Sequence, residues 1–162
     1  MNPVLYIGVI GAGECTEKEA SLAEEVGFEI AKRSAVLICG GKGGVMEAAA
    51  KGARRADGIV IGILPGRNRS ESNPYLTIAL PTGLGDARNA VITRASDVLI
   101  AISGGYGTLS EIGLALKMGK PVVGLSTWEM KRGMREFDVR QVYSPLEAVE
   151  TALLLGQSKE KG

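Results

Sequence analysis

Two glycine-rich turns, each placed between an apolar run and a segment of helical character, most constrain the fold of this chain. Gly40–Gly44 follows the apolar run Val36–Cys39, and Gly104–Thr108 follows Asp97–Ile102. Glycines at a strand end allow backbone N–H groups to approach an anion closely, and a helix that begins there directs the positive end of its dipole to the same place. The sequence therefore predicts two phosphate-binding turns that converge on one ligand at the carboxyl edge of a sheet.

Strands and helices are expected to alternate, and the expected strands are runs of Val, Ile and Leu, as in a parallel sheet covered on both faces. This alternation predicts a Rossmann-like α/β fold, a doubly wound three-layer sandwich with a mostly parallel sheet of about six or seven strands. The expected strands are Val4–Ile10, Val36–Cys39, Gly58–Leu64, Leu76–Leu80, Asp97–Ile102 and Pro121–Leu125, and the expected helices are Glu17–Arg33, Val45–Ala56, Asp86–Ser96, Thr108–Met118 and Pro145–Leu155.

One domain accounts for almost the whole sequence, because 162 residues are enough for one substantial core. We expect a nucleotide-binding domain over residues 1–156 and a disordered polar tail over residues 157–162. Thr16 and Glu19 have the spacing of a capping box at the start of a helix. The polar, turn-rich segment Pro65–Pro74 has the length of many active-site lids.

The composition argues against several classes of partner. The chain has 19 Lys and Arg against 18 Asp and Glu and only 4% aromatic residues, which disfavours nucleic acid. No apolar run reaches the roughly 18 residues of a membrane span and no charged leader precedes the first strand, so we expect a soluble, cytoplasmic protein. With no His and with Cys15 and Cys39 far apart, the usual zinc and iron ligand sets cannot form, and no metal site is expected.

A third glycine segment follows the first expected strand and contains Gly11 and Gly13. Thr16 replaces the third glycine of a dinucleotide-binding fingerprint, and no acidic residue ends the second strand, so classical NAD binding is disfavoured. Gly11 and Gly13 are therefore either ligand contacts or parts of a tight strand-to-helix turn.

The ligand-binding candidates lie mainly in the two glycine turns. The Gly40–Gly44 turn lacks the spacing of a nucleoside-triphosphate P-loop. Its Lys42 either neutralises a bound phosphate or is a solvated turn lysine. The full set of candidates is Gly11, Gly13, Gly41, Lys42, Gly43, Gly44, Asn89, Gly104, Gly105, Tyr106, Gly107 and Thr108.

Glu111 and Arg88 are the candidates for chemistry. Glu111 fits a capping box with Thr108, a purely structural role. Its carboxylate is also within reach of whatever is attached to a bound phosphate, where it can polarise a water or a sugar hydroxyl. Arg88 lies at the entrance to a helix on the same edge and can bind an anion or stabilise developing charge; its structural alternative is a salt bridge with Asp86 or Glu111.

The signature Gly-Gly-x-Gly-Thr-x-x-Glu at Gly104–Glu111, with the earlier turn Gly40–Met46, resembles one superfamily over Val4 to about Leu155. That superfamily contains the Lonely Guy cytokinin-activating phosphoribohydrolases, often labelled lysine decarboxylases, and the molybdenum-cofactor carrier proteins. Its enzymes carry Pro where this chain has Ser103 and an Arg-Lys pair where it has Arg88-Asn89, so the chain is more similar to the carrier-like branch. Arg88 and Glu111 match the catalytic Arg and Glu of the enzymes.

The resemblance implies a Rossmann-like sheet and a homodimer or a higher oligomer built from dimers. It implies as ligand a nucleoside 5′-monophosphate or the phosphate-bearing pterin of the molybdenum cofactor. We expect carrier-like binding of such a molecule, with no cofactor required for catalysis.

Two other functions stay open. The first is a nucleoside 5′-monophosphate phosphoribohydrolase that releases free base and ribose 5-phosphate, with Glu111 acting on water or the ribose and Arg88 on developing charge. The second is a scaffold with no ligand in the cleft. Pyridoxal-phosphate-dependent decarboxylation is disfavoured, because neither Lys42 nor Lys117 lies in a recognisable site for it.

Overall fold

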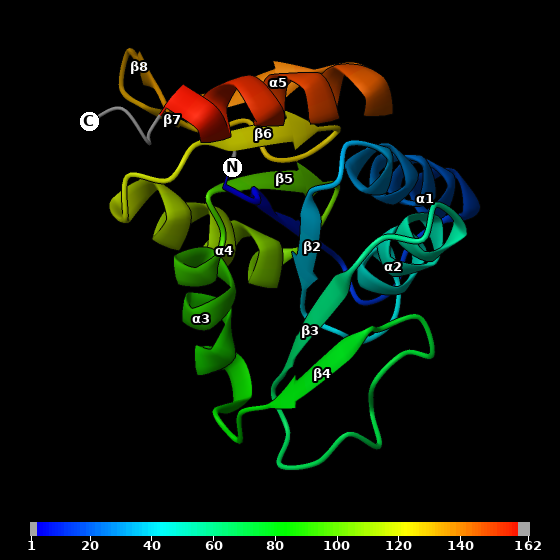
Figure 1. The fold of residues 1–162 in the computed structure, drawn as a ribbon. Coiled ribbons are helices and arrows are strands. Elements are labelled where there is room, and N and C mark those ends of the chain that lie inside the picture. The colour runs from blue at the N-terminus through cyan, green and yellow to red at the C-terminus, as the bar shows by residue number, and fades with distance from the viewer. Residues whose placement is uncertain (1–2, 159–162) are drawn as a thin grey trace.

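A single parallel sheet forms the centre of the computed structural model, which describes residues 3–158 (Figure 1). The seven strands lie in the order β4-β3-β2-β1-β5-β6-β9, and every neighbouring pair in this sheet is parallel. The predicted Rossmann-like fold is therefore confirmed. The strands are β1 (Tyr6–Gly11), β2 (Val36–Cys39), β3 (Val60–Leu64), β4 (Ile78–Pro81), β5 (Val98–Ile102), β6 (Val122–Leu125) and β9 (Val139–Val142).

Helices cover both faces of the sheet (Figure 1). The larger core joins one face to α1 (Glu17–Lys32), α2 (Val45–Arg55) and α5 (Pro145–Gln157). A smaller core joins the other face to α3 (Arg88–Ala95) and α4 (Tyr106–Lys117). All side chains of β5 are buried because β5 is a central strand covered on both faces, which is why it reads as a continuous apolar run.

The strand order reverses between β1 and β5, and this position determines where a ligand can enter. From β1 the chain builds β2, β3 and β4 on one side and then returns to place β5 on the other side. The turns that leave the carboxyl ends of β1 and β5 therefore diverge to opposite faces and open a crevice between them. Open parallel sheets bind ligands at this kind of position.

Two glycines allow α1 and α2 to pack with their backbones in contact. A methyl group added at Gly27 would overlap the carbonyl oxygen of Ala49, and one added at Gly52 would overlap the carbonyl oxygen of Glu24. These glycines place α2 directly against α1, so the turns that precede the two helices lie close together at the carboxyl edge.

The structure differs from the sequence-based prediction in a few elements. Strand β9 and the small hairpin of β7 (Lys131–Arg132) and β8 (Arg135–Glu136) were not predicted. The expected helix Asp86–Ser96 is a short 3₁₀ turn, η1 (Gly85–Ala87), followed by α3. The last helix continues through Gln157, and residues 159–162 of the expected tail lie outside the described residues. Among residues 3–158, none of the helices has the length and apolar character needed to cross a bilayer.

Candidate functional site

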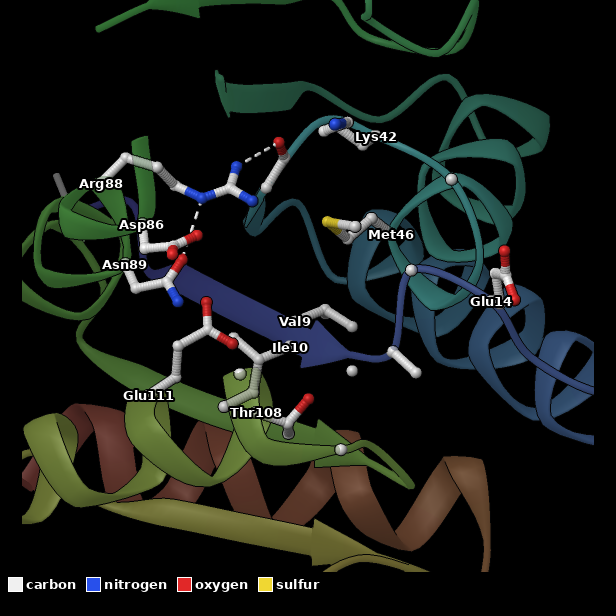
Figure 2. Close-up of a pocket in the computed structure, with 17 residues that line it drawn as sticks. Val9, Ile10, Glu14, Lys42, Met46, Asp86, Arg88, Asn89, Thr108 and Glu111 are labelled. Atoms are coloured by element: carbon white, nitrogen blue, oxygen red, sulfur yellow. Dashed lines mark hydrogen bonds between the residues drawn. The ribbon is translucent and has the colours of Figure 1, made fainter. Parts of the chain in front are cut away.

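A pocket of about 540 Å³ opens at the carboxyl edge of the sheet, over the crevice between β1 and β5 (Figure 2). It receives residues from both glycine turns, so the two turns border one pocket, while their predicted binding of one ligand stays a prediction. The lining residues are Val9, Ile10, Gly11, Ala12, Gly13, Glu14, Gly40, Lys42, Gly43, Met46, Asp86, Arg88, Asn89, Gly105, Gly107, Thr108 and Glu111.

The N-terminus of α4 presents unpaired backbone donors beside this pocket. Its N-cap is Gly105, which has no side chain to accept a hydrogen bond, and the first helical hydrogen bond runs from Leu109 N to Gly105 O at 3.0 Å. The N–H groups of residues 106–108 therefore have no acceptor within the helix. Gly105 and Gly107 are exposed, so a ligand can approach the backbone there.

The helix begins at Tyr106, and the predicted start at Thr108 is wrong. Thr108 is consequently inside the helix, and the capping box with Glu111 does not form. The Thr108 side chain instead packs against Gly104, whose φ of 107° favours glycine and whose Cα leaves no room for a methyl group. Gly104 shapes the turn and lies outside the pocket lining. Tyr106 also lies outside it, 83% exposed and stacked on Trp128 at 6.1 Å.

The first glycine turn contributes Gly40, Lys42 and Gly43 to the pocket. Gly41 and Gly44 have φ angles of 76° and 64° and serve the geometry of the turn rather than the lining. The Lys42 ammonium lies 3.4 Å from a carboxylate oxygen of Glu71. The Pro65–Pro74 segment therefore supplies an ion-pair partner for Lys42, and both side chains of this pair are partly exposed.

The same segment is tied to the first glycine turn by Asn73, which is buried. Its backbone N–H donates to Gly41 O at 2.9 Å, and its side-chain amide donates to Lys42 O at 2.9 Å. The side-chain oxygen of Asn73 accepts from Tyr75 N at 3.0 Å. The loop is therefore part of the wall that supports Lys42.

Gly11 and Gly13 both line the pocket, and they differ in their surroundings. A methyl group on Gly11 would meet Ile102 O at 2.6 Å and the Val45 side chain, so Gly11 permits close approach of neighbouring elements. Gly13 has open space around it. Beyond them, Thr16 and Glu19 form the predicted capping box at the start of α1, which is confirmed.

Arg88 is fixed by three oxygen acceptors. Its guanidinium donates to Gly40 O at 2.6 Å and to the Asn89 side-chain oxygen at 2.9 Å (Figure 2). It also donates to Ile63 O at 2.5 Å. The alternative of a salt bridge with Asp86 or Glu111 is wrong, since within residues 3–158 Arg88 makes no ion pair. Burial lowers the pKa of the guanidinium, and the nearby Glu111 carboxylate opposes this change. Arg88 therefore joins the ends of β2 and β3 and keeps a positive charge at the pocket wall.

Glu111 extends from α4 toward Asn89 and Asp86 (Figure 2). It is 7% exposed and has no hydrogen bond from any residue in the described part of the chain. Burial raises the pKa of its carboxyl to about 7, and the charge of Arg88 opposes this rise. Near neutral pH the group can therefore hold a proton or release one.

The polar side chains are distributed unevenly around the pocket. In Figure 2, Asp86, Asn89 and Glu111 lie together on one flank of the pocket, while Lys42 and Thr108 lie on opposite sides of it. Sequence reasoning did not select Glu14, Met46 or Asp86, although Glu14 directly follows Gly13 and Asp86 lies two residues before Arg88. Among residues 3–158 no group of three or more Cys, Asp or Glu side chains is arranged to hold a metal ion.

Comparison with known proteins gives the same superfamily as the glycine motif. The model of the SLOG cluster4 family matches residues 4–153. The fold is similar to that of the molybdenum cofactor binding protein from the phototrophic bacterium Rippkaea orientalis, with a TM-score of 0.84, 37% identity and coverage of 99% of both chains. It is also similar to the molybdenum cofactor carrier protein from Chlamydomonas reinhardtii, with a TM-score of 0.80, 34% identity and coverage of 94% of this chain and 98% of that chain.

Two sequence relatives extend this comparison. An uncharacterized protein of Archaeoglobus fulgidus is 49% identical over 146 residues, which cover 90% of this chain and 93% of that protein. A probable cytokinin riboside 5′-monophosphate phosphoribohydrolase of Oryza sativa subsp. japonica is 34% identical over 93 residues, or 56% of this chain. The matched region spans 41% of that plant protein. Together these matches confirm the predicted resemblance to the superfamily of Lonely Guy phosphoribohydrolases and molybdenum-cofactor carriers.

Proposed function

The chain belongs to the SLOG cluster4 family, and from this premise we propose that it binds a small phosphorylated molecule at the carboxyl edge of its sheet, in the manner of a carrier. The observation that carries the proposal is the uncapped N-terminus of α4, whose Gly105 and Gly107 line the same pocket as Lys42 and Gly43 of the first glycine turn. Backbone donors and the positive end of a helix dipole favour a phosphate group at α4, and Lys42 adds a positive charge elsewhere on the wall of the same pocket.

The ligand we propose is a nucleoside 5′-monophosphate or a molybdenum-cofactor-type pterin. A pocket volume of about 540 Å³ lies within the range of roughly 300–1,000 Å³ common for small-molecule sites. With the phosphate at α4, the remainder of the ligand faces Asp86, Asn89 and Glu111, which offer acceptors to sugar hydroxyls or to ring N–H groups. The solved relatives named for molybdenum-cofactor binding and carriage support the pterin.

We favour binding over hydrolysis of the N-glycosidic bond because of Arg88. Its Nε and Nη1 already donate to the Asn89 side chain and to the Gly40 and Ile63 carbonyls, which leaves only Nη2 to follow charge that develops on a substrate. Glu111, which can carry a proton near neutral pH, then serves as a hydrogen-bond donor or acceptor to the bound molecule.

The proposal is tested by calorimetric titration of the purified protein with AMP and with inorganic phosphate, followed by chromatography of an AMP incubation. We expect both to bind, AMP more tightly, with no release of adenine. Release of adenine that Glu111→Gln abolishes would replace the carrier by a hydrolase. A ligand at 100 times its dissociation constant should raise the free energy of unfolding by roughly 2.7 kcal/mol. If no phosphorylated compound binds or gives this stabilisation, a scaffold is favoured.

A matched pair of variants tests the position of the phosphate. Gly107 and Gly113 both lie in α4 with open space at Cβ, but only Gly107 lines the pocket. Gly107→Asp places a carboxylate against the incoming anion and is expected to weaken AMP binding more than about tenfold, whereas Gly113→Asp leaves it unchanged. Equal losses in the two variants would contradict a phosphate site at α4.

We further propose a cytoplasmic protein that assembles as a homodimer or as a higher oligomer built from dimers, without a cofactor needed for catalysis. The family resemblance supports this assembly. Light scattering coupled to size-exclusion chromatography tests it, and a monomeric mass at micromolar concentration would contradict it.

A further inference from the structure

The backbone of the turn between β5 and α4 is held by side chains from two other parts of the fold. The Ser103 hydroxyl donates to a carboxylate oxygen of Glu19 at 2.6 Å. From the opposite side, the Thr127 hydroxyl donates to Ser103 O at 2.6 Å and the Trp128 indole donates to Gly105 O at 3.2 Å. These anchors lie immediately before the unpaired N–H groups of α4, so they determine where those donors point.

Glu19 uses both of its carboxylate oxygens. One accepts from Ser103, and the other accepts from the backbone N–H of Thr16 at 2.9 Å. These two hydrogen bonds hold the pKa of the Glu19 carboxyl below its ordinary value, so the group is ionised at neutral pH and both bonds are charge-assisted. A single carboxylate therefore connects the turn after β1 with the turn after β5, the two sides of the crevice in which the pocket lies.

The backbone conformation of Ser103 suits glycine better than serine, which indicates that the Ser103 hydroxyl contributes an interaction of its own. Its φ is 50°, in the left-handed region that glycine adopts freely and other residues adopt at a cost on the order of 1 kcal/mol. Proline, restricted to φ near −65°, cannot take this conformation. Serine therefore adopts this backbone conformation at a higher cost than glycine would. Its side chain contributes the hydrogen bond to Glu19.

We propose that Ser103 and Glu19 are positioning residues, which hold the turn after β1 and the turn after β5 in the register that makes them one anion-binding site. This inference rests on the proposed binding of a phosphorylated ligand. Neither residue lines the pocket, and both act through the backbone of residues that do, namely Gly11–Glu14 on one side and Gly105, Gly107 and Thr108 on the other. Binding constellations depend on placement within about 0.5 Å, so loss of this bridge reduces affinity without removing any ligand contact.

The main test separates affinity from stability with Ser103→Gly. Glycine relieves the left-handed backbone but also removes the charge-assisted hydrogen bond to Glu19, so the melting temperature is expected to change little while affinity for AMP and for inorganic phosphate falls about tenfold. Ser126→Gly is the matched control. Ser126 has a φ of 53°, is exposed after β6, and forms no side-chain hydrogen bond within the described chain. Its variant undergoes the same backbone change without losing a hydrogen bond, and it is expected to be at least as stable and to bind as the unmodified protein does.

A double-mutant cycle tests whether the two residues act together. Glu19→Ala is expected to weaken binding of AMP by a similar factor and also to lower the melting temperature, because it breaks the capping box of α1. Adding Ser103→Gly to Glu19→Ala then gives no further loss of affinity, since the bridge is already absent. Fully additive losses would overturn the coupling.

The outcomes distinguish this inference from the function on which it rests. If the unmodified protein binds AMP and Ser103→Gly binds it equally well, the positioning role is wrong and the proposed function stands. If Ser126→Gly loses as much affinity as Ser103→Gly, the positioning role is also wrong. If the unmodified protein binds neither AMP nor inorganic phosphate, both the proposed function and the positioning role are overturned.

Discussion

The N-termini of α1 and α4 lie at the same edge of the sheet and differ in how their first amides are satisfied. At α1, the Thr16 hydroxyl accepts from Glu19 N and the Glu19 carboxylate accepts from Thr16 N. At α4, the N-cap is Gly105 and no side chain caps the helix. A helix that satisfies its own donors has little left for an anion, so the difference identifies α4 as the end that is available to a ligand.

The same contrast extends to two other helices. At α5 the Ser144 hydroxyl accepts from Glu147 N, so this N-terminus is closed like that of α1. At α2 the N-cap is Gly44, again without a side-chain cap, and the adjacent turn lines the pocket. Side-chain caps are thus found at two N-termini whose cap residues, Thr16 and Ser144, do not line the pocket, and glycine is found at two whose turns do.

The carboxylates near the starts of α1 and α4 also differ, in their hydrogen bonds and in their pKa values. Glu19 of α1 accepts two hydrogen bonds and its pKa is lowered, whereas Glu111 of α4 has no hydrogen-bond partner among the described residues and burial raises its pKa to about 7. The structure therefore keeps a permanent charge where it serves the fold and a titratable group where the pocket lies.

The largest expected effect concerns this buried carboxyl. Because the folded pKa of Glu111 lies above its ordinary 4.5, the native state holds the proton between that value and about 7, and its stability falls as pH rises through this window. Each pKa unit corresponds to about 1.4 kcal/mol, so Glu111→Gln should be more stable than the unmodified protein at pH 8 by roughly 3 kcal/mol and nearly equal to it at pH 4.5. Urea unfolding at several pH values measures this, and an equal difference at all pH values would contradict it.

The second-largest effect is expected from Gly105→Asp, which introduces a capping side chain at the N-terminus of α4. Gly105 has an extended backbone with φ of −98° and open space at Cβ, so an aspartate fits. Its carboxylate is expected to accept from the amides intended for the ligand, which lowers AMP affinity about thirtyfold, near 2 kcal/mol, while stability changes by only a few tenths of a kcal/mol. Calorimetry and urea unfolding measure the two quantities. Gly105→Ala, which adds no acceptor, should lose less affinity, and equal losses would argue against this comparison of helix ends.

The third effect concerns the removal of the side-chain cap of α1. Thr16→Ala removes the hydroxyl that accepts from Glu19 N and should lower the free energy of unfolding by about 1 kcal/mol. AMP affinity should not change, because the Glu19 carboxylate still joins Thr16 N to Ser103. Ser144→Ala at α5 serves as a control with a similar loss of stability. A large change in AMP affinity in either variant would show that capped ends also contribute to binding.

The smallest effect concerns Lys42, whose charge is shared with Glu71. Glu71→Gln releases the lysine for the ligand and should strengthen AMP binding by about two- to threefold, because exposed ion pairs contribute less than about 1 kcal/mol. The gain should shrink as salt is raised. In a Lys42→Met background the same substitution should have no effect, and a gain that persists there would exclude this explanation.

The sequence predicts the buried part of the fold well, because buried strands of a parallel sheet are continuous apolar runs. β5 and β6 are examples, and β2 has the expected bounds. β9 was missed because this edge strand reads Val-Arg-Gln-Val, is buried only at Val142 and has one neighbour, β6. Its assignment depends on pairing with β6, which local sequence does not encode.

The site was only partly predictable, for a related reason. The glycine turns were recognised from local spacing, but the partners of Arg88 are carbonyl groups of Gly40 and Ile63, which are distant in sequence and carry no residue-type signal. The start of α4 at Tyr106 was also missed, since Gly-Tyr-Gly has poor helix propensity. The contacts of Glu19, Thr127 and Trp128 with residues 103–105 hold this turn in place, and these contacts form only in the folded chain.

The backbone contact between α1 and α2 through Gly27 and Gly52 has a mechanical consequence. Close backbone contact at these two positions restricts sliding of α1 against α2, so the two helices are expected to respond to strain as one rigid unit. A larger residue at Gly27 or Gly52 would have to separate the two helix backbones.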